Sequence, residues 1–79
     1  MRISVKLIAT YREHLPPGTQ GNKVDIDVSE GTTVADVMTR FNIPQDETSV
    51  IVVNGLTVAL STPLKEGDLV SAFSAIAGG

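Results

Sequence analysis

Residues 49–60, with the sequence SVIVVNGLTVAL, contain the strongest local signal in the chain. Two strand-forming runs, 49–53 and 56–60, flank the dipeptide Asn54-Gly55. Asn-Gly between such runs is typical of a two-residue β-hairpin, because both residues tolerate the positive φ angles of a type I′ turn. This stretch therefore predicts an antiparallel hairpin in the second half of the chain.

A single amphipathic helix is predicted before the hairpin. Thr33 and Asp36 have the spacing of a capping box, which marks a helix start. Apolar residues then recur at helical spacing: Val34, Val37, Met38 and Phe41. The helix should end before Pro44, because Ile43 precedes a proline and is therefore disfavoured in the α region.

Further strands and turns are predicted before the helix and after the hairpin. Residues 2–9 and 23–28 alternate between apolar and polar side chains, as half-buried strands do. The segment between them, 10–22, contains two prolines and two glycines and predicts a loop with one helical turn near residues 11–15. After the hairpin, a turn at 63–68 leads into a last strand that runs from Leu69 to about Ile76.

These elements predict an α+β fold in two layers, since one helix covers only one face of a small sheet. Ile8 alone departs from the alternation of the first strand, because it places an aliphatic side chain on the outer face. The predicted inward-facing residues are Ile3, Val5, Leu7, Val24, Ile26, Val28, Val34, Val37, Met38, Phe41, Ile51, Val53, Leu64, Val70 and Ala72.

Composition excludes several classes of function. The 79 residues suit one domain, with no cysteine for a disulfide framework or a thiolate metal site. The six basic residues never cluster, so nucleic acid is a poor partner, and the net charge of −3 is compatible with docking onto a basic groove of another protein. No secretory signal and no membrane-spanning stretch are recognised, so we expect a cytoplasmic location and no membrane partner.

The sequence ends in Ala77-Gly78-Gly79, directly after the last predicted strand. Glycine lacks Cβ, so residues 77–79 should form a free tail that can enter a narrow channel and present a bare main-chain carboxylate. A frayed terminus is the alternative interpretation.

The second half of the chain carries a family resemblance. The segments Val52-Val53-Asn54-Gly55, Thr62-Pro63-Leu64-Lys65-Glu66-Gly67-Asp68 and Ala77-Gly78-Gly79 occur in an order that resembles the MoaD/ThiS family of sulfur carriers. The resemblance spans the whole chain. It implies a ubiquitin-like β-grasp fold, with a mixed sheet of four to five strands packed on one main helix.

The resemblance also implies a chemistry. In this family an E1-like adenylating enzyme of the MoeB/ThiF type uses ATP and magnesium to adenylate the last residue, here Gly79. Sulfur then displaces AMP and leaves a thiocarboxylate, while Gly78 and Ala77 thread the tail into partner enzymes. The chain itself is expected to bind no cofactor and to act as a carrier and not as an enzyme.

Other candidate groups are expected to be solvated surface. His14 lies beside Glu13 in the long loop, and Asp25 and Asp27 share the outer face of a strand without a third ligand. We therefore expect neither a catalytic constellation nor a metal site.

A partner surface is predicted on the face of the sheet that the helix cannot cover. Alternation sends Ser71 and Phe73 to this face if Val70 and Ala72 point inward, and it sends Val52 there from the neighbouring strand. Exposed apolar patches usually mark interfaces. The alternative is that residues 10–22 cover Phe73.

The pathway stays open among several alternatives. The chain length, the long loop and Phe73 favour a MoaD-like small subunit of molybdopterin synthase, with the large subunit as sulfur acceptor. A ThiS-like carrier for thiamine thiazole synthesis is the next hypothesis, followed by carriers for tungsten-cofactor or amino-acid synthesis. A ubiquitin-like modifier conjugated through Gly79 and an inert binding module complete the set.

Overall fold

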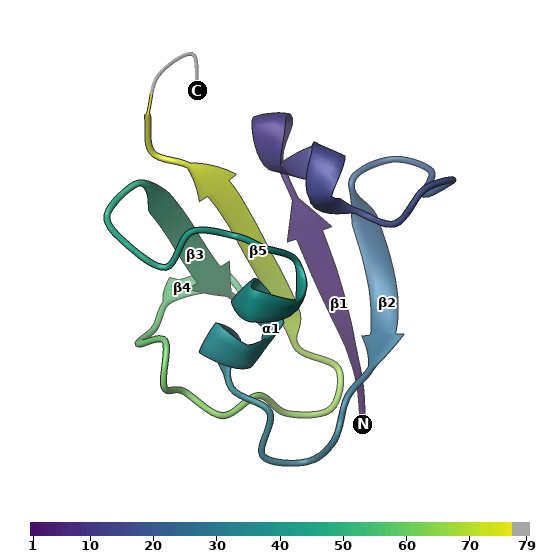
Figure 1. The fold of residues 1–79 in the computed structure, drawn as a ribbon. Helices are drawn as coiled ribbons and strands as arrows, with labels where there is room; N and C mark the ends of the chain where they lie inside the picture. The colour runs from purple at the N-terminus through teal and green to yellow at the C-terminus, as the bar shows by residue number, and fades with distance from the viewer. Residues whose placement is uncertain (77–79) are drawn as a thin grey trace.

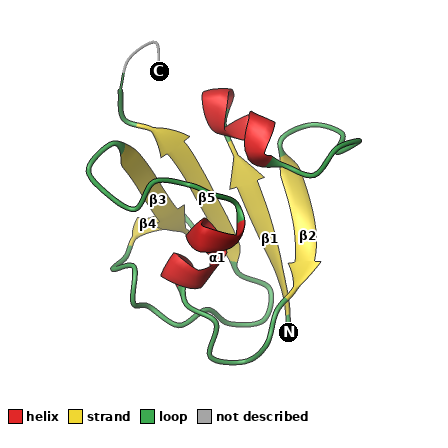
Figure 2. Ribbon diagram, viewed as in Figure 1, coloured by secondary structure: helices red, strands yellow, loops and turns green. Residues whose placement is uncertain are grey.

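The computed structural model describes residues 1–76, which form a five-stranded mixed sheet covered on one face by an α-helix (Figures 1 and 2). The sheet order is β2-β1-β5-β3-β4, with the central pair β1 and β5 parallel and the other pairs antiparallel. The elements are β1 (Arg2–Leu7), the 3₁₀ helix η1 (Ala9–His14), β2 (Lys23–Asp27), α1 (Val34–Arg40), β3 (Ser49–Val53), β4 (Leu56–Thr57) and β5 (Leu69–Ser74). The predicted α+β class, the mixed sheet and the single main helix are confirmed.

The Asn-Gly hairpin forms as predicted. Asn54 and Gly55 have φ angles of 52° and 84°, and Val53 pairs with Leu56 across the two-residue turn. The prediction that the second strand of this hairpin runs to Leu60 is wrong, because β4 ends at Thr57.

Segment 60–62 leaves the sheet and meets the start of the helix. The carbonyl oxygens of Leu60 and Thr62 accept hydrogen bonds from the N–H groups of Ala35 (2.9 Å) and Val34 (3.1 Å). The first N–H groups of a helix have no partner within the helix, so this segment satisfies them instead of extending β4.

The two sequence motifs of the second half are joined by side chains. Asn54 accepts a hydrogen bond from the Leu69 N–H through Oδ1 and donates to Asp68 Oδ1 through Nδ2, both at 2.9 Å. Asp68 Oδ2 in turn accepts from the Lys65 N–H at 2.8 Å, which closes the 63–68 turn. The hairpin and the turn before β5 therefore hold one another in position.

Both ends of α1 have defined caps. Thr33 and Asp36 form the predicted capping box. At the other end Asn42 adopts a φ of 58°, and the Ile43 N–H donates to the Met38 carbonyl at 2.9 Å. A left-handed residue followed by a hydrogen bond back into the helix is a Schellman motif. This motif ends the helix, so Pro44 is not required to end it.

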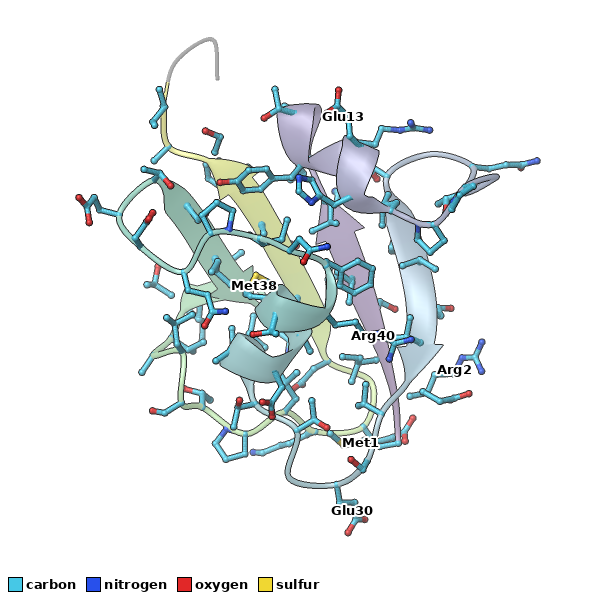
Figure 3. All side chains as sticks on the ribbon, in the orientation of Figure 1. Met1, Arg2, Glu13, Glu30, Met38 and Arg40 are labelled. Carbon is cyan, nitrogen blue, oxygen red and sulfur yellow. The ribbon has the colours of Figure 1, made fainter. Side chains whose placement is uncertain are left out.

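The core lies between α1 and the sheet, where Met38 is fully buried (Figure 3). Three of the predicted inward residues, Val24, Val28 and Ile51, are only half-buried at its margin. The other predicted residues are all buried: Ile3, Val5, Leu7, Ile26, Val34, Val37, Met38, Phe41, Val53, Leu64, Val70 and Ala72.

The prediction that the first strand runs to Ala9 is wrong. β1 ends at Leu7, and Ala9 is exposed with a φ of 54°, which turns the chain out of the sheet and into η1. The 3₁₀ helix replaces the single turn expected near residues 11–15 and adds the buried side chains of Tyr11 and Leu15 to the core. Segment 9–15 is thus a structural part of the core and not a solvated loop.

Candidate functional site

The predicted reactive tail begins beyond the described residues. Gly79, Gly78 and Ala77 lie outside the described range, which ends at Ile76. β5 ends at Ser74, opposite Ser49, so the prediction of a strand to about Ile76 is two residues too long. The last bond to the sheet runs from the Ala75 N–H to the Thr48 carbonyl at 2.8 Å.

The start of the tail lies at a defined end of the molecule. β1 and β5 are parallel, so both finish at the same end of the sheet, and η1 lies there as well (Figure 1). Ile76 is 56 % exposed at this end. The described part of the chain therefore finishes at the sheet end formed by β5, β1 and η1.

The three predicted partner-binding residues share the face of the sheet opposite α1, which we call the open face. The register pairs Val52 with Ser71, and Phe73 follows two positions later on β5. Phe73 is 36 % exposed, while Val52 and Ser71 are half-buried. The structure thus brings Val52, Ser71 and Phe73 together next to the start of the tail.

Two further apolar residues of this surface were missed. Val50 lies directly opposite Phe73 in the register and is half-buried. Ile8 continues β1 in extended conformation (φ −106°, ψ 146°), and its N–H donates to the Ala72 carbonyl at 3.1 Å, so alternation places its side chain on the open face beside β5. The sequence could have revealed Ile8, because it is the one residue that departs from the alternation of the first strand. We call Ile8, Val50, Val52 and Phe73 the apolar patch.

Segment 10–22 does not bury Phe73. The large apolar side chains of η1 and of the residue that caps it, Tyr11 and Leu15, belong to the core. The Tyr11 hydroxyl lies 2.6 Å from Ser49 Oγ and 3.4 Å from the Thr48 carbonyl. These contacts fix η1 to β3 and leave the open face uncovered by that segment.

The other candidate groups have structural partners. His14 Nδ1 lies 2.8 Å from the Phe41 carbonyl, so His14 links η1 to the end of α1 and is more than a solvated loop residue. Asp25 accepts a hydrogen bond from Ser4 (2.6 Å), and Asp27 forms an ion pair with Arg2 (3.5 Å). No group of three or more potential metal ligands occurs within residues 1–76.

One carboxylate has a perturbed titration. Thr48 donates to Asp46 through its hydroxyl and its backbone N–H, and these hydrogen bonds hold the pKa of Asp46 below its usual value. Asp46 lies in the loop before β3 and shapes the turn that positions Thr48, whose carbonyl accepts the hydrogen bond from the Ala75 N–H.

Comparison with solved structures defines the class of the fold. SAMP1 from Haloferax volcanii matches over 100 % of both chains with a TM-score of 0.77 and 22 % identity. A candidate molybdopterin converting factor, subunit 1, from Pyrococcus furiosus matches with a TM-score of 0.74 and 26 % identity, over 95 % of this chain and 98 % of the other. A second structure of the H. volcanii small archaeal modifier protein 1 gives a TM-score of 0.75 at 20 % identity, again over 95 % and 98 %. The chain is a ubiquitin-like β-grasp protein.

The sequence narrows this class to one family. The model of the ThiS family matches residues 5–79, which is nearly the whole chain and includes Gly78-Gly79. The chain therefore belongs to the ThiS family. No curated protein matches the sequence. None of the helices formed by residues 1–76 is long and apolar enough to cross a bilayer.

Proposed function

We propose that this protein is a sulfur carrier whose Gly79 carboxylate is activated by a separate E1-like adenylating enzyme. The observation that carries the proposal is the family match through residue 79, combined with the open face at the start of the tail. The apolar patch lies beside the segment that leads to Gly79. A partner that docks there would hold the tail within reach of its own active site.

The proposed chemistry has two steps. A Gly79 carboxylate oxygen attacks the α-phosphorus of ATP, and pyrophosphate leaves, which gives a mixed anhydride with AMP. A sulfide-level nucleophile from a separate donor then attacks the carbonyl carbon, and AMP leaves with the electron pair of the C–O bond. The product is a Gly79 thiocarboxylate. The carrier contributes the tail and the docking surface, while ATP and magnesium belong to the activating enzyme.

We further propose molybdopterin synthesis as the pathway, with the large subunit of molybdopterin synthase as acceptor. The similarity to the Pyrococcus furiosus protein, at 26 % identity over almost the full length, supports this choice. The match to the ThiS family model equally suits a carrier for thiamine thiazole synthesis. Purified carrier thiocarboxylate distinguishes the two, since it should support dithiolene formation with a molybdopterin synthase large subunit but not thiazole formation with a thiazole synthase.

The proposal is tested by intact-mass analysis of the protein after incubation with the adenylating enzyme from the same genome, ATP, magnesium and a sulfur donor. Replacement of one terminal oxygen by sulfur is expected. A variant with one alanine added after Gly79 is the matched control, because it should keep the fold and lose the reaction. An unmodified wild-type mass in the presence of an active enzyme contradicts the proposal.

A second candidate is a protein modifier joined to target lysines through Gly79. Two of the similar structures are of the H. volcanii small archaeal modifier protein 1, which supports this candidate through the fold. Isopeptide-linked adducts of the chain in a cell lysate would favour it. Deleting Gly78-Gly79 separates both candidates from an inert binding module, because only the module keeps its function without these residues.

A further inference from the structure

One cross-strand pair on the open face places two positive charges opposite each other. β1 and β2 place three cross-strand pairs on this face, and two of them are complementary. Arg2 forms an ion pair with Asp27 at 3.5 Å, and Ser4 donates to Asp25 at 2.6 Å. The third pair places Lys6 directly opposite Lys23.

Two like charges directly opposite each other destabilise an antiparallel strand pair. No carboxylate within residues 1–76 lies at ion-pair distance from either lysine, since Arg2–Asp27 is the one salt bridge of the described region. Lys23 is exposed and Lys6 is half-buried. The fold itself therefore gives no reason to place these two ammonium groups side by side.

The pair adjoins the surface already described. Lys6 is next to Ser71 in the register, and Ser71 is next to Val52, so a single row crosses the sheet from Lys23 to Val52. The neighbouring row contains Phe73 opposite Val50. Both rows lie toward the end of the sheet from which β5 leads into the tail (Figure 1).

The local charge of this surface is opposite to that of the chain. The net charge is −3, yet the rows that border the apolar patch present two lysines and no acid. The acidic chain as a whole is compatible with a basic groove, but the two lysines in these rows would be repelled by one. Charge complementarity requires carboxylates on the docking partner at this place.

We propose that Lys6 and Lys23 form, with the apolar patch, a docking surface for the adenylating enzyme, and that the enzyme presents carboxylates beside an apolar pocket. This inference rests on the proposed function, because it names the partner surface of the same site. The lysines would accelerate and orient the encounter, and the apolar patch would hold the complex after water has left.

The inference predicts a specific kinetic signature. Charges at the edge of an interface act mainly on association and are screened by salt. The KM of the adenylating enzyme for the carrier should therefore rise with ionic strength. The turnover at saturating carrier should stay unchanged, since charges that act on the encounter no longer limit the rate once the carrier is bound.

The test is ATP–pyrophosphate exchange by the adenylating enzyme from the same genome, with the full-length chain as substrate. The double variant Lys6→Glu/Lys23→Glu should raise KM by about tenfold or more at low salt and reverse the salt dependence, because salt then screens a repulsion. The matched control is Arg40→Glu/Lys65→Glu, which changes the net charge equally at two exposed positions away from the open face (Arg40 on α1, Figure 3). It should change KM by less than about twofold.

A single variant separates docking from a structural role. Lys6→Glu places opposite charges across β1 and β2, so the melting temperature should stay equal or rise while KM rises. A fall in the melting temperature with unchanged KM would assign the lysines to the fold alone and overturn the inference. An unchanged KM for the double variant, with the wild type still adenylated, would overturn it as well. Absence of adenylation in the wild type would instead contradict the proposed function.

Discussion

Asn54→Ala should destabilise the fold by about 2–4 kcal/mol, more than a typical exposed turn substitution. Alanine at the φ of 52° that Asn54 adopts costs about 1 kcal/mol, because asparagine tolerates the left-handed region better than alanine does. The substitution also removes the hydrogen bonds to the Leu69 N–H and to Asp68, both 2.9 Å, at about 0.5–1.5 kcal/mol each. Urea unfolding followed by circular dichroism should show a lower midpoint with an unchanged slope.

Two variants separate the backbone term from the hydrogen bonds. Asn42 also has a positive φ, of 58°, but its side chain makes no hydrogen bond within residues 1–76, so Asn42→Ala should cost only about 1 kcal/mol. Asn54→Gly keeps the turn conformation and loses the hydrogen bonds, so it should lie between the other two variants. If Asn54→Ala costs no more than Asn42→Ala, the link between the hairpin and the 63–68 turn contributes nothing and the reasoning is refuted.

Three further outcomes are expected. Phe41→Ala should lower the free energy of unfolding by about 3–5 kcal/mol, because Phe41 is 5 % exposed in the core, and a parent-like midpoint in urea would contradict this packing. Phe73→Ala should leave the unfolding midpoint nearly unchanged but weaken binding to the adenylating enzyme by about 1–3 kcal/mol in calorimetry, and equal affinity would remove Phe73 from the docking surface. The hydrogen bonds from Thr48 lower the pKa of Asp46, so their stabilisation is present above the ordinary aspartate pKa of 3.8 and is lost as the pH falls through the lower folded pKa. Asp46→Asn should therefore destabilise the protein at neutral pH and have little effect below the folded pKa, and a cost independent of pH would contradict the assignment.

Local signals in the sequence predicted the elements that local sterics determine. The Asn54-Gly55 turn and the Thr33–Asp36 capping box each depend on a few neighbouring residues, and both form as predicted. Alternation along β3 and β5 likewise placed Val52, Ser71 and Phe73 on one face without knowledge of the fold.

The errors occur where distant segments compete for the same backbone. β4 is short because Leu60 and Thr62 bond to the start of α1, and nothing within residues 56–62 reveals that preference. η1 begins at Ala9, which has a positive φ although it is not a glycine, so the sequence gives no sign of this turn. Tyr11 then holds η1 against β3. Such contacts depend on tertiary packing and not on a period in the sequence.

The candidate site was likewise predictable from the sequence only in part. Membership of a face follows from alternation within one strand, whereas the neighbours across strands depend on register. Val50 opposite Phe73 and Lys6 opposite Lys23 are register pairs. The overall charge is compatible with a basic partner, but the register places two lysines beside the apolar patch. Only the pairing of strands reveals that difference between the whole chain and its docking surface.

The most direct test of the account is detection of an acyl-adenylate on Gly79. The full-length protein is incubated with its adenylating enzyme, ATP and magnesium but no sulfur donor, and the quenched product is fragmented in a mass spectrometer. The account predicts one AMP on the C-terminal fragment that contains Gly79, with release of one equivalent of pyrophosphate. An unmodified C-terminal fragment from folded protein, with an enzyme that is active on another carrier, would contradict it.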